Sequence, residues 1–119
     1  MNYFLVFLGG GVGSVIRYVF SLVFQKTTIA LPIATLLANV TSCLLFAGVV
    51  YVFKEKHLIP DTYKYIILIG VCGGLSTFST FSFETFELLK QGLLLWAVAN
   101  ILISVALCVS VFYVLSRSV

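Results

Sequence analysis

The sequence predicts an all-α membrane protein of four transmembrane helices, the third of them broken in mid-membrane. Of the 119 residues, 61% are hydrophobic and 9% are charged, whereas soluble domains carry about 25% charged residues. One span requires about 20 apolar residues, so the chain holds four spans and leaves no room for a soluble domain. Four apolar stretches, separated by short polar segments, match that expectation, and the third is interrupted by glycines and hydroxyl residues.

The first two spans are expected at residues 3–24 and 31–53. The first has no basic residues ahead of its apolar run and continues past Arg17, which favours a retained helix over a cleaved signal peptide. The second begins near Pro32, whose missing N–H costs nothing in the first turn of a helix.

The third span is expected at residues 63–89 and the fourth at 93–115, joined by a polar turn. Gly70, Gly73 and Gly74 each lower helix stability by about 1 kcal/mol relative to alanine. Five of the seven residues 76–82 carry hydroxyls, at 76, 77, 79, 80 and 82, and such side chains compete for backbone hydrogen bonds. The pattern favours a break between two half-helices, and tight packing of small residues is the alternative explanation.

Two phenylalanines stand among these hydroxyls. Phe78 and Phe81 are three residues apart and therefore share a helix face. The edge of an aromatic ring carries positive charge, so such a pair can contact an anion weakly. Phe83 and Phe86 repeat the spacing on another face, where lipid contact is the expected role.

Polar side chains also lie inside the second and fourth spans. Asn39 stands in the middle of the second, with Thr35 four residues earlier on the same face. An amide at that depth is costly unless it bonds to another helix or lines a pore. In the fourth span Asn100, Ser104 and Cys108 recur every four residues. They form either a polar track or an ordinary helix contact.

The first span combines a glycine pair with a buried cation. Gly9 and Gly13 form a G-x-x-x-G contact face typical of transmembrane helices. Arg17 must reach the interface, pair with an acid or serve an anion. Glu84, at the end of the third-span motif, either caps, pairs or faces a vestibule. An anchoring role at a helix end is the alternative for both.

Charge and cysteine content exclude several classes of function. The net charge of +3 comes from scattered residues, so nucleic-acid binding has no support. Cys43, Cys72 and Cys108 form no C-x-x-C pair, and the single histidine, His57, lies in a polar loop. The pattern predicts neither a cysteine–histidine metal site nor a disulfide framework. We find no pairing of nucleophile and base that would indicate an enzyme.

The distribution of basic residues gives almost no preference for one orientation in the membrane. With four spans, both termini lie on one side. That side holds Lys54, Lys56, Lys64 and Arg117, and the other holds Lys26, Lys90 and, through its long side chain, Arg17. With four basic residues on one side and three on the other, the positive-inside rule gives almost no preference. The chain could therefore insert in both orientations.

Three motifs in order, one in each of the first three spans, resemble a known family. They are Gly-Gly-Val-Gly-Ser-Val-Ile-Arg-Tyr (residues 10–18), Thr-Leu-Leu-Ala-Asn (35–39), and the stretch from Gly73 to Glu84. Together with chain length, they resemble the Fluc (CrcB-type) fluoride channels of bacteria. The resemblance implies passive fluoride export through two pores in a dual-topology homodimer, two protomers inserted antiparallel in the bacterial cell membrane.

The resemblance also implies roles for individual residues. It implies a structural Na⁺ at the dimer centre, held by the backbone carbonyls of Gly73 and Ser76. The expected fluoride-pathway residues are Asn39, Phe78, Phe81, Thr77, Thr35, Arg17 and Glu84. Ser104 joins them from its spacing alone. Arg17 would serve the vestibule, and Glu84 is the acid that ends the third motif.

Two other functions are compatible with four short spans. A small proton-coupled multidrug exporter is the main alternative, but such exporters need a carboxylate in the first helix, where this chain has Arg17. A non-transporting membrane scaffold would use the glycine contacts. It would leave the hydroxyl and phenylalanine motif without a purpose.

Overall fold

A computed structural model describes residues 2–52 and 60–118. Four helical segments in this part of the chain are long and apolar enough to cross a membrane, as predicted: Asn2–Val23, Ile33–Tyr51, Asp61–Lys90 and Leu94–Arg117. The predicted end of the second span at residue 53 and the polar loop with Lys54, Lys56 and His57 lie outside the described residues.

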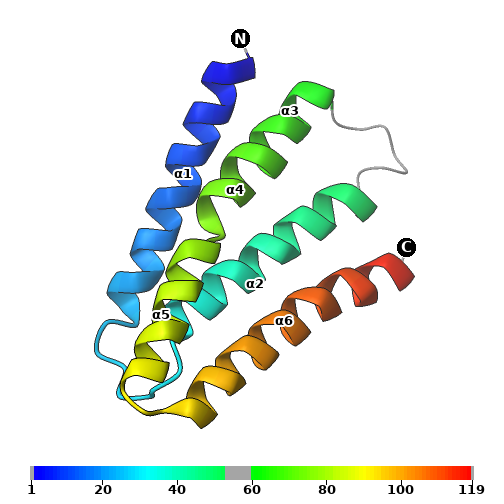
Figure 1. Ribbon diagram of the computed structural model, residues 1–119. Helices are drawn as coiled ribbons and strands as arrows, with labels where there is room; N and C mark the ends of the chain where they lie inside the picture. Colours follow the sequence, from blue (N-terminus) through cyan, green and yellow to red (C-terminus); the bar gives the residue numbers. More distant parts are fainter. Residues whose placement is uncertain (1, 53–59, 119) are drawn as a thin grey trace.

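The elements follow one another as α1 (Asn2–Val23), α2 (Ile33–Ala47), η1 (Gly48–Val52), α3 (Asp61–Tyr65), η2 (Ile66–Val71), α4 (Cys72–Leu75), α5 (Phe78–Lys90) and α6 (Leu94–Arg117). The two η elements are π-helical turns that continue their neighbours. Helix α1 packs on η2 and α4, while α6 packs on α2 and α5. In Figure 1, α1 and α6 lie on opposite sides with α4 and α2 between them.

Glycines allow α1 to approach the first half of the third span closely. Gly9 and Gly13 are buried and face a second glycine pair, Gly70 and Gly74. A Cβ at Gly13 would lie on the carbonyl of Val71, and one at Gly74 on the carbonyl of Gly10. The predicted contact face of α1 is therefore a seam between two G-x-x-x-G motifs, where the helix backbones touch.

A Schellman motif ends α5 and turns the chain into α6. Gly92 has a φ of 77°, which glycine adopts without a Cβ penalty. The amide of Leu93 donates to the carbonyl of Leu88 (2.9 Å), and that of Gly92 donates to Leu89 (3.0 Å). These bonds satisfy carbonyls at the end of α5 and direct α6 back along α5 and α2.

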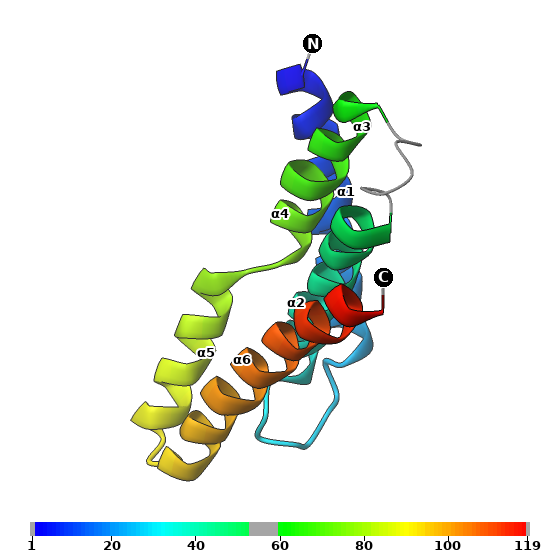
Figure 2. The same ribbon diagram turned by 90° about the vertical axis from the view of Figure 1, so that its right-hand side faces the viewer.

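The third span changes direction between α4 and α5. Ser76 (φ −75°, ψ 154°) and Thr77 (φ −151°, ψ 124°) both have extended backbones. Figure 2 shows that α5 is displaced sideways from the axis of α4 at this point. We call Ser76 and Thr77 the extended pair. The Ser76 amide still donates to the carbonyl of Cys72 four residues earlier (3.0 Å), whereas the Thr77 amide leaves the helical hydrogen-bond pattern and needs another partner.

The interior of the bundle is unusually polar, whereas large apolar side chains point outward. Among the described residues, the buried polar side chains are Thr35, Ser42, Thr77, Thr85, Asn100 and Ser104. Exposed side chains include Phe7, Phe83, Phe86 and Leu102, each more than half accessible. Apolar side chains outside are the arrangement that hydrocarbon surroundings favour, and buried polar groups mark functional positions.

Candidate functional site

Asn39 holds the extended pair by its side-chain amide. Its Oδ1 accepts from the amide of Thr77 at 2.7 Å, and its Nδ2 donates to the carbonyl of Thr77 at 3.2 Å. Both backbone groups of Thr77 are therefore satisfied by one side chain of α2. Because Thr77 presents a donor and an acceptor together, it also fixes which end of the Asn39 amide is the donor.

The end of α4 is held in a similar way. The carbonyl of Cys72 accepts from Ser42 Oγ (2.9 Å) and from Ser76 Oγ (2.7 Å), in addition to the Ser76 amide (3.0 Å). Ser42 lies on α2 and is buried. Two side chains of α2, Asn39 and Ser42, thus fix both sides of the extended pair.

Thr77 also begins α5 as its N-cap residue. Its Oγ1 accepts from the amide of Thr80 (3.2 Å) and lies 3.3 Å from Ser79 Oγ. In a continuous helix, the amides of Thr77 and Thr80 would bond to the carbonyls of Gly73 and Ser76. They donate to Asn39 and to Thr77 Oγ1 instead. The carbonyl oxygens of Gly73 and Ser76 are thereby released from the helical pattern.

One cavity of about 280 Å³ collects most of the residues predicted to form the site. We call it the amide cavity. It is lined by Asn39, Cys43, Ser76, Thr77, Phe78, Phe81, Ser104, Val105 and Cys108. The rings of Phe78 and Phe81 form one of its walls, with centroids 5.9 Å apart and planes at 41°. The structure therefore brings the second, third and fourth spans together around the extended pair.

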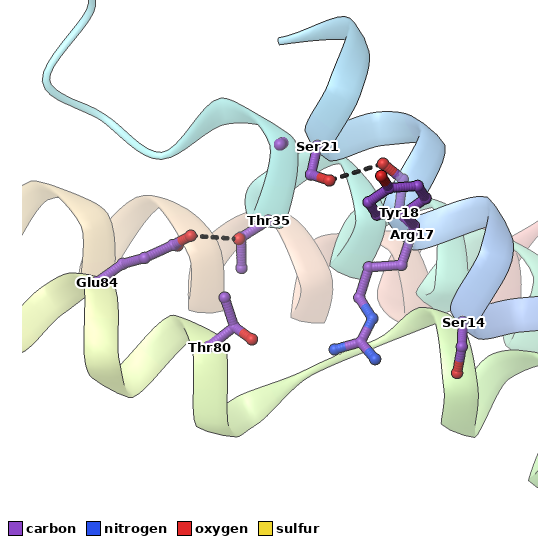
Figure 3. A pocket seen from close by; sticks show the side chains of 8 residues that line it. Ser14, Arg17, Tyr18, Ser21, Thr35, Thr80 and Glu84 are labelled. Atoms are coloured by element: carbon purple, nitrogen blue, oxygen red, sulfur yellow. Dashed lines mark hydrogen bonds between the residues drawn. The ribbon is translucent and has the colours of Figure 1, made fainter. Parts of the chain in front are cut away.

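A second cavity, of about 320 Å³, is lined by the other residues predicted for the fluoride pathway: Arg17, Thr35 and Glu84. Figure 3 shows that the Arg17 side chain extends from α1 into this space, which we call the arginine cavity. Thr35 donates to Glu84 Oε1 at 2.8 Å, and Glu84 Oε2 is buried without a hydrogen-bond partner in the described chain. Arg17 and Glu84, both described, line the cavity without forming a salt bridge to each other.

Asn100 differs from Ser104 and Cys108, the other two residues of the predicted fourth-span track. Ser104 and Cys108 line the amide cavity, but Asn100 is 1% exposed and lines neither cavity. Its Nδ2 donates to Thr85 Oγ1 (2.9 Å), and its Oδ1 accepts from Ser104 (3.4 Å). Asn100 thus joins α5 to α6.

Thr85 is the residue that sequence reasoning missed. It is buried, and its hydroxyl donates to the carbonyl of Phe81 at 2.8 Å while accepting from Asn100. A chain of hydrogen bonds therefore runs from Ser104 through Asn100 and Thr85 to the backbone of Phe81. The available signal was a hydroxyl four residues after Phe81 on the same helix face.

Comparison with known proteins decides the family. The model of the family described as CrcB-like protein, Camphor Resistance (CrcB), matches residues 4–115. The chain belongs to the CrcB-like family. The match spans all four membrane-capable helices, so the resemblance inferred from the three motifs is confirmed for nearly the whole chain.

Curated relatives of this CrcB-like chain come from several bacteria. It is 41% identical over 101 residues to "Fluoride-specific ion channel FluC 1" of Yersinia pseudotuberculosis, covering 85% of this chain and 80% of the relative. It is 42% identical over 113 residues to "Fluoride-specific ion channel FluC" of Coxiella burnetii (strain Dugway 5J108-111), covering 92% and 90%. A Salmonella newport relative of the same name is 43% identical over 100 residues, covering 83% and 78%. Family membership and the four spans identify a multi-pass bacterial membrane protein.

Proposed function

We propose that this chain is a fluoride-selective ion channel that exports fluoride passively across the bacterial cell membrane and so confers fluoride resistance. The observation that carries the proposal is the amide cavity. It combines the Asn39 amide, hydroxyls and two phenylalanine rings, and its lining contains neither carboxylates nor cations. Relatives named fluoride-specific ion channels support the choice of anion. No enzymatic reaction is involved, since the family is one of channels.

Fluoride must exchange its tightly held water for hydrogen-bond donors in the pathway. The Asn39 amide has two N–H groups, and one of them is used by the carbonyl of Thr77. The second remains for an anion in the amide cavity. Because the Thr77 amide holds Oδ1 at 2.7 Å, the side chain cannot turn its oxygen toward the anion. Asn39 is therefore a donor of fixed orientation.

Phe78 and Phe81 would make the pathway selective without trapping the ion. A ring edge attracts an anion only weakly, and conduction requires binding that permits release. The two rings form one wall of the amide cavity, where they would narrow the path for larger halides. Thr77 and Ser104 line the same space. The Thr77 hydroxyl would replace part of the hydration shell, whereas the Ser104 hydroxyl donates to Asn100 Oδ1 at 3.4 Å.

The arginine cavity would form the entrance to the pathway. The Arg17 guanidinium supplies positive potential there, which raises the local concentration of anions. The Thr35 hydroxyl is directed at Glu84 Oε1, so it stabilises this carboxylate rather than donating to the passing ion. Glu84 would then set how strongly the entrance attracts fluoride.

The carbonyls of Gly73 and Ser76 fit a site for Na⁺. Their usual amide partners are directed elsewhere, and Gly73 is exposed at the surface of the chain. Na⁺ bound there would add fixed positive charge close to the amide cavity. We propose that a second copy, inserted antiparallel, supplies two further carbonyls, and that the extended pair therefore lies at mid-membrane at the centre of a dual-topology homodimer.

The alternative of a proton-coupled multidrug exporter finds less support. Such an exporter needs a membrane-embedded carboxylate in its first helix, and α1 contains neither aspartate nor glutamate. Glu84 lies on α5 and accepts a hydrogen bond from Thr35. The amide cavity, with donors but no acid in its lining, suits an anion better than a cationic drug.

Efflux from liposomes tests the proposed function. Purified protein is reconstituted into liposomes loaded with fluoride, and release is followed with a fluoride electrode after the membrane potential is clamped. The same preparation is loaded with chloride as control. Rapid release of fluoride with retention of chloride is expected. Retention of both anions by a folded, membrane-inserted protein would contradict the proposal, as would equal release of both.

A further inference from the structure

Two thiols face the amide cavity from opposite helices. Cys43 on α2 lies four residues after Asn39, and Cys108 on α6 lies four residues after Ser104. Both line the cavity and are half-buried. Each cysteine thus stands one helical turn from a residue of the proposed fluoride pathway.

The helices are held together next to this pair. One turn beyond the cysteines, Phe46 and Phe112 pack edge to face with ring centroids 5.8 Å apart. On the other side, Asn39 of α2 accepts from Thr77 at the start of α5, and Asn100, the acceptor of Ser104 within α6, donates to Thr85 of α5. The two thiols therefore sit at a constrained point of the α2–α6 contact rather than on mobile surfaces.

We propose that Cys43 and Cys108 together form a binding site for a soft, two-coordinate d¹⁰ cation such as Hg²⁺, Ag⁺ or Cu⁺, and that its occupation closes the fluoride pathway. Thiolates select such soft cations. Groups of three or more metal-binding side chains are absent from the described residues, which disfavours a four-coordinate zinc site. A linear site needs only two sulfur ligands.

The binding step is a proton exchange without redox change. Two S–H bonds break, two metal–sulfur bonds form, and two protons leave to solvent for each cation bound. The product is neutral with Hg²⁺ and carries one negative charge with Ag⁺ or Cu⁺. In either case the cavity loses two S–H donors and gains a large atom beside Asn39. Closure of the pathway rests on the proposed channel function, whereas metal binding does not.

Hg²⁺ serves as the probe, with Cys72 providing the matched control. Cys72 is buried on α4 and does not line the amide cavity. Binding is followed in detergent by the ultraviolet band of mercury–thiolate bonds and by metal content per chain. The wild-type chain and Cys72→Ala are expected to bind Hg²⁺ tightly. Cys43→Ala and Cys108→Ala should bind roughly 100-fold more weakly, since the second ligand no longer acts intramolecularly.

The variants Cys43→Ser and Cys108→Ser nearly conserve side-chain volume and serve as a second pair in case the alanine variants misfold. Size-exclusion chromatography monitors the folding of every variant. Equal Hg²⁺ affinity in wild type and in folded Cys43 or Cys108 variants would overturn the two-thiol site. Loss of fluoride efflux on adding Hg²⁺ to wild type and to Cys72→Ala supports closure, and undiminished efflux with the metal bound refutes it. Tight two-thiol binding by a chain that releases no fluoride even without Hg²⁺ would contradict the channel and leave the metal site intact.

Discussion

Asn39 of α2 satisfies both backbone groups of Thr77, through Oδ1 at 2.7 Å and Nδ2 at 3.2 Å. A backbone that leaves the helical pattern inside a membrane has no water to bond with, so unpaired groups cost several kcal/mol each. One amide side chain removes that cost at the residue where the third span is extended. The same contact orients the proposed fluoride donor, which makes Asn39 both structural and functional.

Replacing Asn39 with aspartate is expected to abolish fluoride efflux. The carboxylate keeps an acceptor for the Thr77 amide but places a second oxygen against the Thr77 carbonyl, and it adds negative charge to an anion pathway. Repulsion between the carboxylate and the anion raises the barrier to passage, and each increase of about 1.4 kcal/mol in that barrier slows efflux about tenfold. Liposome efflux is the measurement, with Asn39→Leu as the uncharged comparison.

Asn39→Leu removes both hydrogen bonds without adding charge. We expect it to reduce both efflux and the free energy of unfolding. Wild-type efflux through well-folded Asn39→Asp would show that the anion does not pass this amide.

Phe81→Ile is expected to abolish fluoride efflux while the protein stays folded. Isoleucine keeps an apolar side chain but lacks the positive ring edge that would contact the anion. Phe83→Ile is the matched control on the same helix, because Phe83 is 62% exposed and lines neither the amide nor the arginine cavity. Efflux rates of the two variants are compared in the same liposomes. Unchanged efflux in Phe81→Ile would show that fluoride does not need the ring edge of Phe81 to pass.

Gly13→Ala should destabilise the bundle by about 1–3 kcal/mol, the usual cost of overpacking. Its Cβ would lie on the carbonyl of Val71 and force α1 away from α4. Gly11→Ala is the control on the same helix, where a Cβ meets no atom within 4 Å and alanine favours the helix. Unfolding in denaturing detergent, followed by the fluorescence of the single tryptophan, Trp96, gives the free energies. Equal stability of both variants would refute the glycine seam.

Asn100→Ala should lower the free energy of unfolding by about 0.6–1.7 kcal/mol, the range found for hydrogen bonds between transmembrane helices. It leaves Thr85 of α5 without its partner on α6, and Ser104 without its acceptor within α6. Ser110→Ala is the control on α6, since Ser110 is exposed and bonds only within its own helix. The same unfolding assay compares them. A larger loss in Ser110→Ala than in Asn100→Ala would contradict the proposed link.

Much of the candidate site could be predicted because membrane spans restrict where polar residues occur. Asn39, Thr77 and Ser104 are unusual inside apolar stretches, and all three line the amide cavity. Asn100 follows the same four-residue spacing, but its amide donates a hydrogen bond to Thr85. Spacing identifies the face of a helix, but it does not reveal which partner lies opposite. Thr85 escaped notice because hydroxyl residues are common along α5, which also carries Ser79, Thr80 and Ser82.

The sequence by itself determined the class of protein, its four spans and its family, because hydrocarbon demands apolar length and the three motifs are specific. Only the tertiary structure decided which polar residues bond to each other and which cavity each of them lines. It directs Asn39 to the backbone of Thr77 and Thr35 to Glu84, and it separates the arginine cavity from the amide cavity. It also brings Cys43 and Cys108 to the same cavity. Such pairings depend on contacts between helices distant in the chain, and local residue patterns carry no information about that packing.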